Sequence, residues 1–337
     1  MMFHLPLKCT LLPSRKTLGK LILAVPLLCI AGCAEKAPSY SEYWRSWGDT
    51  QLEHWASSSK KLEVDSLTYC QGALGLDQVQ NQILDLALIW AGINGLPYHA
   101  IADLNLNFEL YFWPDKRDMT RARLSQRLQS GIPLTENTLA EATAAEKGLL
   151  ALEWIGFSDQ LTNEQRCDLL PAVSAHYQDN VQKISKYHGE NPLVNKAWIQ
   201  DAQSPEGKSI ALNLLFQQLA YFSNSLRNSM NASTGKLIPV LAQGWRMDAS
   251  PRIFSASLNS VIQHLQALNM RVDLSATTKE KLQTHITAMQ SLSTELSNQD
   301  FDWRRLQQVI IAAEGVIEGP VAQEQNILLG FSNYDGD

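Results

Sequence analysis

The chain has 337 residues and a formal net charge of −6, from 28 Lys and Arg against 34 Asp and Glu. An acidic chain lacks the clustered basic side chains that nucleic acids require, so we exclude nucleic acid as a partner. The roughly 300 residues that follow the N-terminal segment exceed the usual size of one hydrophobic core and predict two domains.

The first 32 residues are predicted to be a lipoprotein export signal. Four basic residues precede or flank a short apolar run over residues 21–30, and Ile30-Ala31-Gly32-Cys33 resembles a lipobox that ends in the acceptor cysteine. The apolar run falls short of the ~20 residues that span a bilayer, which disfavours the alternative of a transmembrane anchor. Removal of the signal takes away four basic and no acidic side chains and lowers the net charge to −10.

Lipid on Cys33 would hold the mature chain on a membrane, with residues 33–41 as the lipidated tether. The signal resembles those of bacterial lipoproteins, in which a residue other than aspartate after the cysteine favours the outer membrane. That residue is Ala34 here. We therefore expect an outer-membrane lipoprotein that faces the periplasm.

The rest of the chain is predicted to be helical, because apolar residues recur every three or four positions over long stretches. A capping box of Thr162 and Gln165 begins one helix, in which Pro171 should cause a kink or a restart, and Thr277 with Glu280 begins another. Only Leu106–Trp113 has strand-like character. The apolar stripes are Leu170, Val173, Tyr177, Val181 and Ile184; Leu212, Leu215, Phe216, Leu219, Phe222, Leu226 and Met230; Phe254, Leu258, Val261, Ile262, Leu265 and Leu268; and Leu282, Ile286, Met289, Leu292 and Leu296.

The polar, loop-rich interval Gly189–Lys208 is the best boundary between two helical bundles. We place the N-terminal bundle at residues 42–200 and the C-terminal bundle at residues 201–337. A second irregular stretch, Gly235–Pro251, interrupts the later half, and such a break often carries a functional loop.

The number of cysteines left in the folded part is consistent with export to an oxidising compartment. After loss of the signal and lipidation of Cys33, only Cys70 and Cys167 are left in the folded part. In an oxidising compartment they could form a disulfide that closes a long loop, or they could be two separate buried thiols. Both alternatives stay open.

Three segments together resemble the imelysin family, the M75 group of bacterial extracytoplasmic proteins. They are Tyr111–Arg117, similar to an aromatic-Trp-Pro-Asp-Lys-Arg block that includes Trp113, Asp115 and Arg117; Gly148–Trp154, which falls on a Gly-x-His-x-x-Glu motif; and the tail Gly330–Asp337. The resemblance implies an all-α, bilobal fold of two packed helix bundles. It also implies a link to bacterial iron acquisition and to a group classified as metallopeptidases.

The motif residues decide which of these implications the chain can support. A His and a Glu three residues apart share one helix face and could bind one metal ion. The histidine position is Leu150, which has no donor atom, so Gly148 and Glu153 are what is left of the motif. Glu146 lies one turn earlier, and two carboxylates without an imidazole suit Ca²⁺, Mn²⁺ or ferric iron better than catalytic zinc.

The alternative for these residues is structural. Leu150 would then belong to the core, and Glu153 would be buried against Arg117 or Arg252 or lie at the surface. By resemblance, Arg252 and Ser257 sit where the family has a helix start that faces the first lobe. Asp115 is expected near the positive end of the next helix dipole, with Pro114 in the first turn of that helix.

Other catalytic classes have no support in the sequence. It contains no HExxH, no GxSxG and no glycine-rich phosphate loop. Our leading hypothesis is an imelysin-like lipoprotein without catalysis, which binds a ligand, metal or partner in connection with iron uptake. The alternatives are an M75-type metallopeptidase with a non-standard metal site, for example His99 with Glu153, and a structural docking lipoprotein. No cofactor follows from the residues beyond a candidate iron or divalent metal ion.

Overall fold

A computed structural model describes residues 38–94, 101, 103–190 and 205–329, all within one compact unit. The expected signal, Cys33, the boundary near residue 200 and the tail Gly330–Asp337 lie outside these residues. Within them the chain is helical and has no β-sheet, only an isolated bridge between Met230 and Leu237. In the same residues no helix is long and apolar enough to cross a bilayer.

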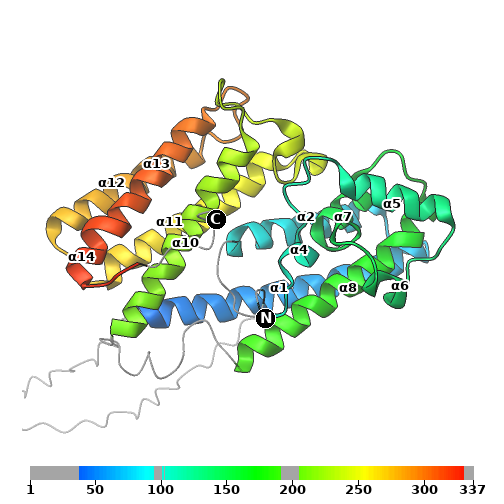
Figure 1. Cartoon of the computed structure of the whole chain (residues 1–337), viewed down its shortest axis with the longest axis horizontal. Helices are drawn as coiled ribbons and strands as arrows, with labels where there is room; N and C mark the ends of the chain where they lie inside the picture. The colour runs from blue at the N-terminus through cyan, green and yellow to red at the C-terminus, as the bar shows by residue number, and fades with distance from the viewer. Residues whose placement is uncertain (1–37, 95–100, 102, 191–204, 330–337) are drawn as a thin grey trace, which may run out of the picture. The chain divides into compact units, whose positions relative to one another are not determined.

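The helices before residue 191 form the N-terminal bundle, and those after residue 204 form the C-terminal bundle (Figure 1). The N-terminal helices are α1 (Tyr40–Cys70), α2 (Leu76–Ile93), α4 (Asn107–Leu110), α5 (Met119–Ser130), α6 (Glu136–Ala140), η1 (Ala144–Glu146), α7 (Gly148–Phe157) and α8 (Asn163–Glu190). The C-terminal helices are α10 (Pro205–Ser229), η2 (Pro239–Leu241), η3 (Trp245–Met247), α11 (Ser250–Arg271), α12 (Ala276–Ser293), α13 (Trp303–Val316), η4 (Ile317–Val321) and α14 (Ala322–Gln325).

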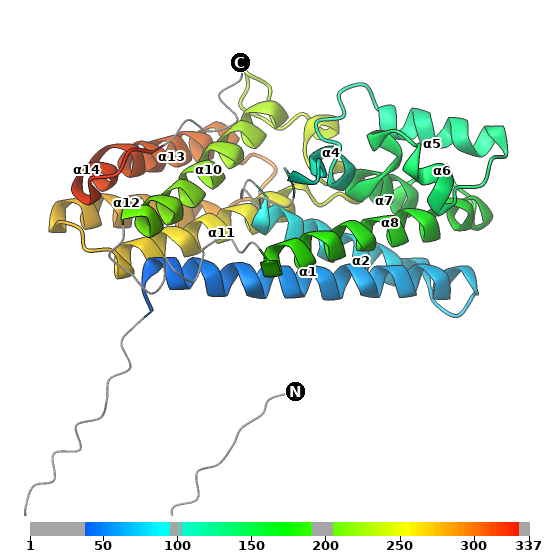
Figure 2. The same cartoon turned by 60° about the horizontal axis from the view of Figure 1, so that its bottom comes forward.

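The long helix α1 contacts both bundles. It packs against α2 and α8, and it also contacts α10 and α11 (Figure 2). Near its start, Trp44 stacks on His264 of α11 with ring centroids 4.0 Å apart. Complete burial lowers the pKa of His264 to about 3, so this histidine is neutral and structural.

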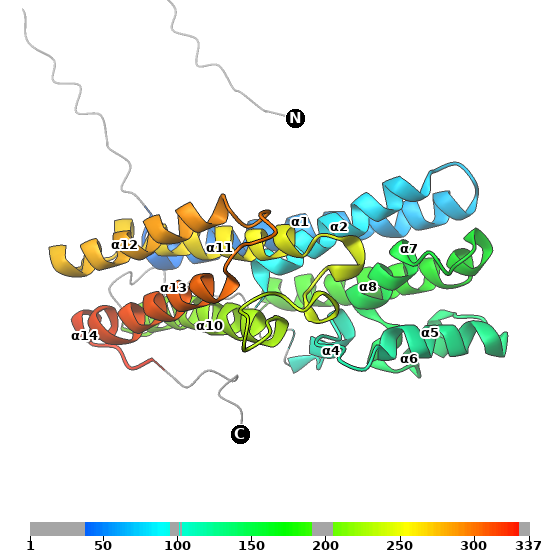
Figure 3. The same ribbon diagram turned by 90° about the horizontal axis from the view of Figure 1, so that it is seen from above.

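The two bundles meet where α2 packs against α11 (Figure 3). They also meet where α7 contacts η3, and we call these two contacts the seam. On the α2 side, the hydroxyl of Ser257 donates to the Ala91 carbonyl at 2.8 Å, and that of Ser260 donates to the Gly92 carbonyl at 2.7 Å. These bonds satisfy carbonyls at the end of α2 and tie the bundles together. The predicted all-α fold of two packed bundles is confirmed.

The apolar stripes form the core as predicted. In the stripes of α8, α11 and α12 every residue is buried, as is Leu296 just after α12; in the stripe of α10 only Phe216 and Met230 are half-buried. The 3.6-residue period of an amphipathic helix therefore identified the inward faces correctly.

Helix α8 continues through Pro171, so the helix does not restart there. Two other local predictions were wrong. Helix α12 is capped by Ser275, not Thr277, since Glu324 binds the Ser275 N–H at 2.7 Å and selects that residue. Leu106–Trp113 contains the single helical turn α4 in place of a strand.

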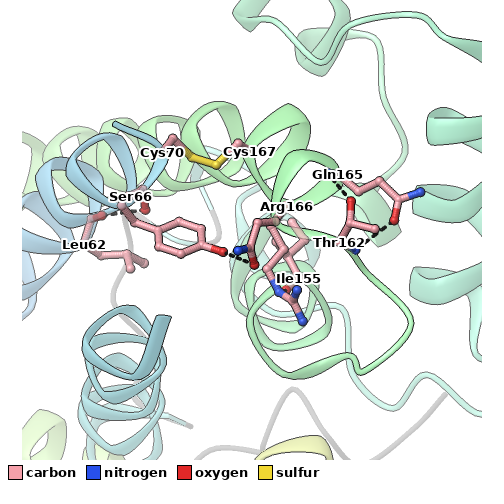
Figure 4. The surroundings of a disulfide bond; sticks show 10 residues. Leu62, Ser66, Cys70, Ile155, Thr162, Gln165, Arg166 and Cys167 are labelled. Carbon is pink, nitrogen blue, oxygen red and sulfur yellow. Dashed lines mark hydrogen bonds between the residues drawn. A yellow bond between two sulfur atoms is a disulfide. The ribbon is translucent and has the colours of Figure 1, made fainter. Parts of the chain in front are cut away.

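The end of α1 is joined to the start of α8 by a disulfide between Cys70 and Cys167, with Cα atoms 5.5 Å apart (Figure 4). Beside it, the Tyr69 hydroxyl donates to Asn163 at 2.9 Å, and the predicted capping box of Thr162 and Gln165 is present. Of the two alternatives for the cysteines, the structure has the disulfide. With a sequence separation of 97, the chain-entropy model assigns the bond about 4 to 5 kcal/mol of stability.

Candidate functional site

Gly148 begins α7 in a conformation that only glycine tolerates well. Its φ is +71°, and a Cβ atom would lie 2.3 Å from the Glu109 carbonyl oxygen and 2.6 Å from that of Leu110. The preceding residue, Lys147, is buried and its ammonium binds the Glu109 carboxylate at 2.9 Å. The motif glycine therefore lets α4 and the start of α7 touch backbone to backbone.

Leu150 lies in the core and is 2 % exposed. Its neighbours along α7, from Gly148 to Gly156, are buried as well. The position that carries histidine in the motif thus holds a hydrocarbon side chain that cannot bind a metal ion. This agrees with the structural alternative for Leu150.

Glu146 is an ion-pair partner with both carboxylate oxygens in use. One oxygen accepts two hydrogen bonds from Arg127, at 2.8 and 3.0 Å, and the other accepts from the N–H and the hydroxyl of Thr143, both at 3.0 Å. Burial raises the pKa of Glu146, but the bonds from Arg127 and Thr143 outweigh it, so this pKa lies below its ordinary value. Glu146 closes the capping box of η1 and is not a free ligand.

The hydrogen bonding of Glu153 is incomplete, in contrast to that of Glu146. Its side chain is fully buried, and one carboxylate oxygen accepts a hydrogen bond from the backbone N–H of Arg246 at 3.0 Å. The other oxygen has no hydrogen-bond partner among the described residues. Burial raises the pKa of Glu153 to about 7, and the charge and N–H of Arg246 only partly oppose that rise. Near neutral pH the Glu153 carboxyl is therefore present in both its protonated and its ionised form.

Arg246 lies in η3, within the irregular stretch that separates α10 from α11. A tight turn places it there: Gly244 has φ +73°, and a Cβ atom on it would lie 2.8 Å from Ile253. One terminal nitrogen of Arg246 donates to Asp118 at 2.6 Å, and the guanidinium lies 4.5 Å from the centre of the Trp245 ring. The other terminal nitrogen is buried and unpartnered within the described part of the chain.

The Trp113–Asp115 block leads into α5. The Asp115 carboxylate accepts the backbone N–H groups of Met119 and Thr120, at 2.7 and 2.9 Å, so it binds the positive end of α5 as predicted. Pro114 precedes the helix, which corrects its predicted place in the first turn. The indole N–H of Trp113 is buried and meets no acceptor in the described residues.

Tyr111 connects this block to Glu153. The phenol is buried, and its pKa lies well above the ordinary value because of burial and then the nearby charge of Glu153. Tyr111 is therefore a neutral hydrogen-bonding group at physiological pH. Together, Glu153, Arg246, Asp118 and Tyr111 form what we call the Glu153 cluster, which joins α7 to η3 at the seam.

The sequence named the wrong arginines as partners of Glu153. Arg117 and Arg252 are both exposed, and the hydrogen bond to Glu153 comes from Arg246. Ser257 does face the first bundle, through Ala91. Sequence reasoning missed Arg246, although the irregular Gly235–Pro251 stretch around it was a usable signal.

The seam also carries a surface groove of about 480 Å³ between α1, α2 and α11. Trp47, His54, Asp85, Ser260 and Gln263 contribute to its lining. Glu153 does not line this groove, so it is a second feature of the seam.

The donor set does not fit the metal that a peptidase would need. The described residues contain no group of three or more His, Cys, Asp or Glu side chains placed to hold a metal ion. Both oxygens of Glu146 are bonded to Arg127 and Thr143, so of the predicted carboxylate pair only Glu153 keeps an oxygen without a partner among the described residues. His99, proposed as an alternative ligand, lies outside the described residues.

Comparison with known proteins bears on the family and the fold. The sequence profile of the imelysin family, peptidase M75, matches residues 48–316. The fold is similar to the crystal structure of an imelysin-like protein from Psychrobacter arcticum 273-4, with a TM-score of 0.73 and 18 % sequence identity over 87 % of this chain and 97 % of that one. A search of curated proteins finds no match.

Proposed function

Because this chain belongs to the imelysin family, we propose that it is an extracytoplasmic lipoprotein that binds a ligand at the Glu153 cluster and does not cleave peptides. Its setting is iron acquisition, and its anchor is lipid on Cys33 in the outer membrane, facing the periplasm. The unpartnered oxygen of the buried Glu153 carboxylate supports the binding role most directly.

A buried carboxylate that uses one oxygen and leaves the other unpartnered costs free energy unless something binds it. A further buried donor of the cluster, on Arg246, also lacks an acceptor among the described residues. Near neutral pH, protonated Glu153 adds a second donor. A ligand that presents oxygen acceptors, such as a carboxylate or a chelated oxyanion, would satisfy both.

The chemistry of α7 argues against hydrolysis. A catalytic zinc site needs three protein ligands and an open position for water. Leu150 supplies no donor, and the Glu146 carboxylate is occupied by Arg127 and Thr143. The described part of the chain therefore has the fold of this family without three side chains placed to hold a metal ion.

Protein that lacks residues 1–32 tests both halves of the proposal. We expect no tight zinc binding by titration calorimetry and no cleavage of unfolded peptides, with or without a chelator. Robust chelator-sensitive cleavage that disappears in Glu153→Ala would overturn the non-catalytic assignment.

Ligand binding is tested by thermal shift against ferric citrate, free ferric and divalent ions, and haem. We expect ferric citrate or haem, which present carboxylates, to raise the melting temperature of the native chain but not that of Arg246→Ala, because this variant loses the unpartnered terminal nitrogen of the guanidinium; the free ions should have no such effect. The exposed variant Arg252→Ala is the matched control and should respond like the native chain. A transcript level that does not change under iron limitation would contradict the iron setting.

A further inference from the structure

We infer that the end of the molecule where α1 begins and α11 ends lies against the lipid bilayer, with Met270 and Leu328 in contact with the lipid interface. The inference rests on the lipid anchor of the proposed function, and it adds which surface of the folded chain faces the membrane. Helix α14 and the turn from α11 to α12 lie at this same end (Figures 1 and 2).

The point where the chain leaves the folded unit is held in place. Arg271, the last residue of α11, donates to the Pro38 carbonyl at 3.0 Å, and its guanidinium lies 5.5 Å from the centre of the Tyr43 ring. The next residue, Ser39, is the N-cap of α1 in a complete capping box with Glu42. The chain before Pro38 therefore starts from a defined position beside the end of α11.

The tether between Cys33 and Pro38 is short. Five residue steps separate Cys33 from Pro38, and a fully extended chain covers at most about 18 Å in five steps. A lipid on Cys33 would keep Pro38 and the adjacent end of α11 within that distance of the bilayer. Residues far from Pro38 are not constrained in this way.

Two large apolar side chains are exposed at this end. Met270 is 72 % exposed and Leu328 is 94 % exposed. The segment that carries Leu328 is tied to the turn after α11, because Gln325 donates to the Asp273 carbonyl at 2.6 Å and Glu324 accepts from Ser275. Met270 and Leu328 thus belong to one end of the fold, and an apolar surface next to a short lipid tether is suited to a bilayer interface.

The charges at this end favour contact through apolar groups over attraction to anionic headgroups. The charges there are mixed: the acidic Asp273, Glu280 and Glu324 lie with the basic Arg271, Lys279 and Lys281. A polybasic surface is what attracts anionic lipid, and these residues do not form one. We therefore expect the contact to persist in high salt.

Other exposed apolar residues serve as internal controls. Val64 is 50 % exposed on α1, 24 residues beyond Tyr40 in the same helix. At 1.5 Å per residue, this places it about 36 Å along the helix from its start. A short tether at Pro38 cannot bring Val64 to the same surface as Met270 unless the molecule lies flat.

The experiment uses the full lipidated chain in vesicles of phosphatidylethanolamine and phosphatidylglycerol. An environment-sensitive fluorophore is attached to Met270→Cys, Leu328→Cys or Val64→Cys under non-reducing conditions that preserve the Cys70–Cys167 disulfide. Lipids with a nitroxide near the headgroup should quench the labels at positions 270 and 328 at least twofold and leave the label at 64 unchanged, at both 0.05 and about 0.5 M salt. Insertion of about 20 Gly and Ser residues after Lys36 should abolish the quenching, because the longer tether no longer holds the end at the surface.

Vesicle flotation separates the two possible failures. Chain that floats with equal quenching at positions 270 and 64 would overturn the membrane-facing surface while leaving the anchor intact. Chain that does not float would overturn both the anchor and this surface.

Discussion

Two glutamates seven residues apart, on either side of Gly148, have opposite environments. Glu146 has both oxygens hydrogen-bonded to Arg127 and Thr143, and its pKa is lowered below the ordinary value. Glu153 is fully buried with one oxygen unpartnered among the described residues, and burial raises its pKa to about 7. A satisfied carboxylate holds the fold together, whereas a half-satisfied one at the seam is the better candidate for binding.

The largest expected effect comes from the glycine between them. Gly148→Ala adds a Cβ atom 2.3 Å from the Glu109 carbonyl oxygen at φ +71°, so α4 must move or α7 must start differently. Strain and overpacking together predict a loss of about 4 kcal/mol in the free energy of unfolding, measured by urea denaturation. Gly315→Ala in α13, where the new Cβ meets nothing within 4 Å, is the control and should be neutral or slightly stabilising.

Glu153→Gln should change how stability depends on pH. Because the folded pKa of Glu153 is raised from 4.5 to about 7, folding takes up a proton between these values, and the native chain should lose about 3 kcal/mol as pH rises through this window. The glutamine keeps an acceptor for the Arg246 N–H and carries no charge, so its stability should lack this loss. Urea midpoints from pH 4 to 8 measure the difference, and parallel profiles for the two proteins would contradict it.

Glu146→Gln should be destabilising by about 2 kcal/mol, because it removes a charged acceptor from the half-buried Arg127. Its pH dependence has the opposite sign: the lowered pKa means that Glu146 stabilises the fold above its ordinary pKa, and this contribution is lost as pH falls. The exposed pair Lys60–Glu63 provides the control, since Glu63→Gln should cost at most about 0.5 kcal/mol.

Arg246→Ala should have the smallest effect on stability among these variants, about 1.5 kcal/mol from the lost charge-assisted bond to the half-exposed Asp118. The variant keeps the backbone N–H to Glu153 but removes the positive charge that lowers the pKa of Glu153. The pH window of the Glu153 effect should therefore move upward. Arg117→Ala and Arg252→Ala, both at exposed residues, should leave the window and the stability unchanged; a shift of equal size in either of them would show that Arg246 has no special role.

The helical fold was predictable because an apolar side chain every three or four residues leaves few other ways to bury it. The stripes of α8 and α12 show this, since their members are buried as expected. The error at Thr277 concerns a contact with a distant segment: Glu324 accepts hydrogen bonds from the N–H and the hydroxyl of Ser275, which caps the helix in place of Thr277.

The candidate site was predictable in part. The motif spacing identified Gly148, Leu150 and Glu153, but the partner of Glu153 comes from a loop 93 residues later in the chain. No periodicity or spacing pairs Glu153 with Arg246 in preference to Arg117 or Arg252. The same limit applied to Cys70 and Cys167, whose pairing depends on how α1 and α8 lie together.

By itself, the sequence determined the helical class, the inward faces of the helices, the family and the absence of a donor atom at position 150, since each of these follows from residue type and local spacing. Only the tertiary structure decided that Glu146 is fully bonded and Glu153 is not. That distinction depends on which distant donors the packing brings within 3 Å of each carboxylate, and on how much water it removes from each of them.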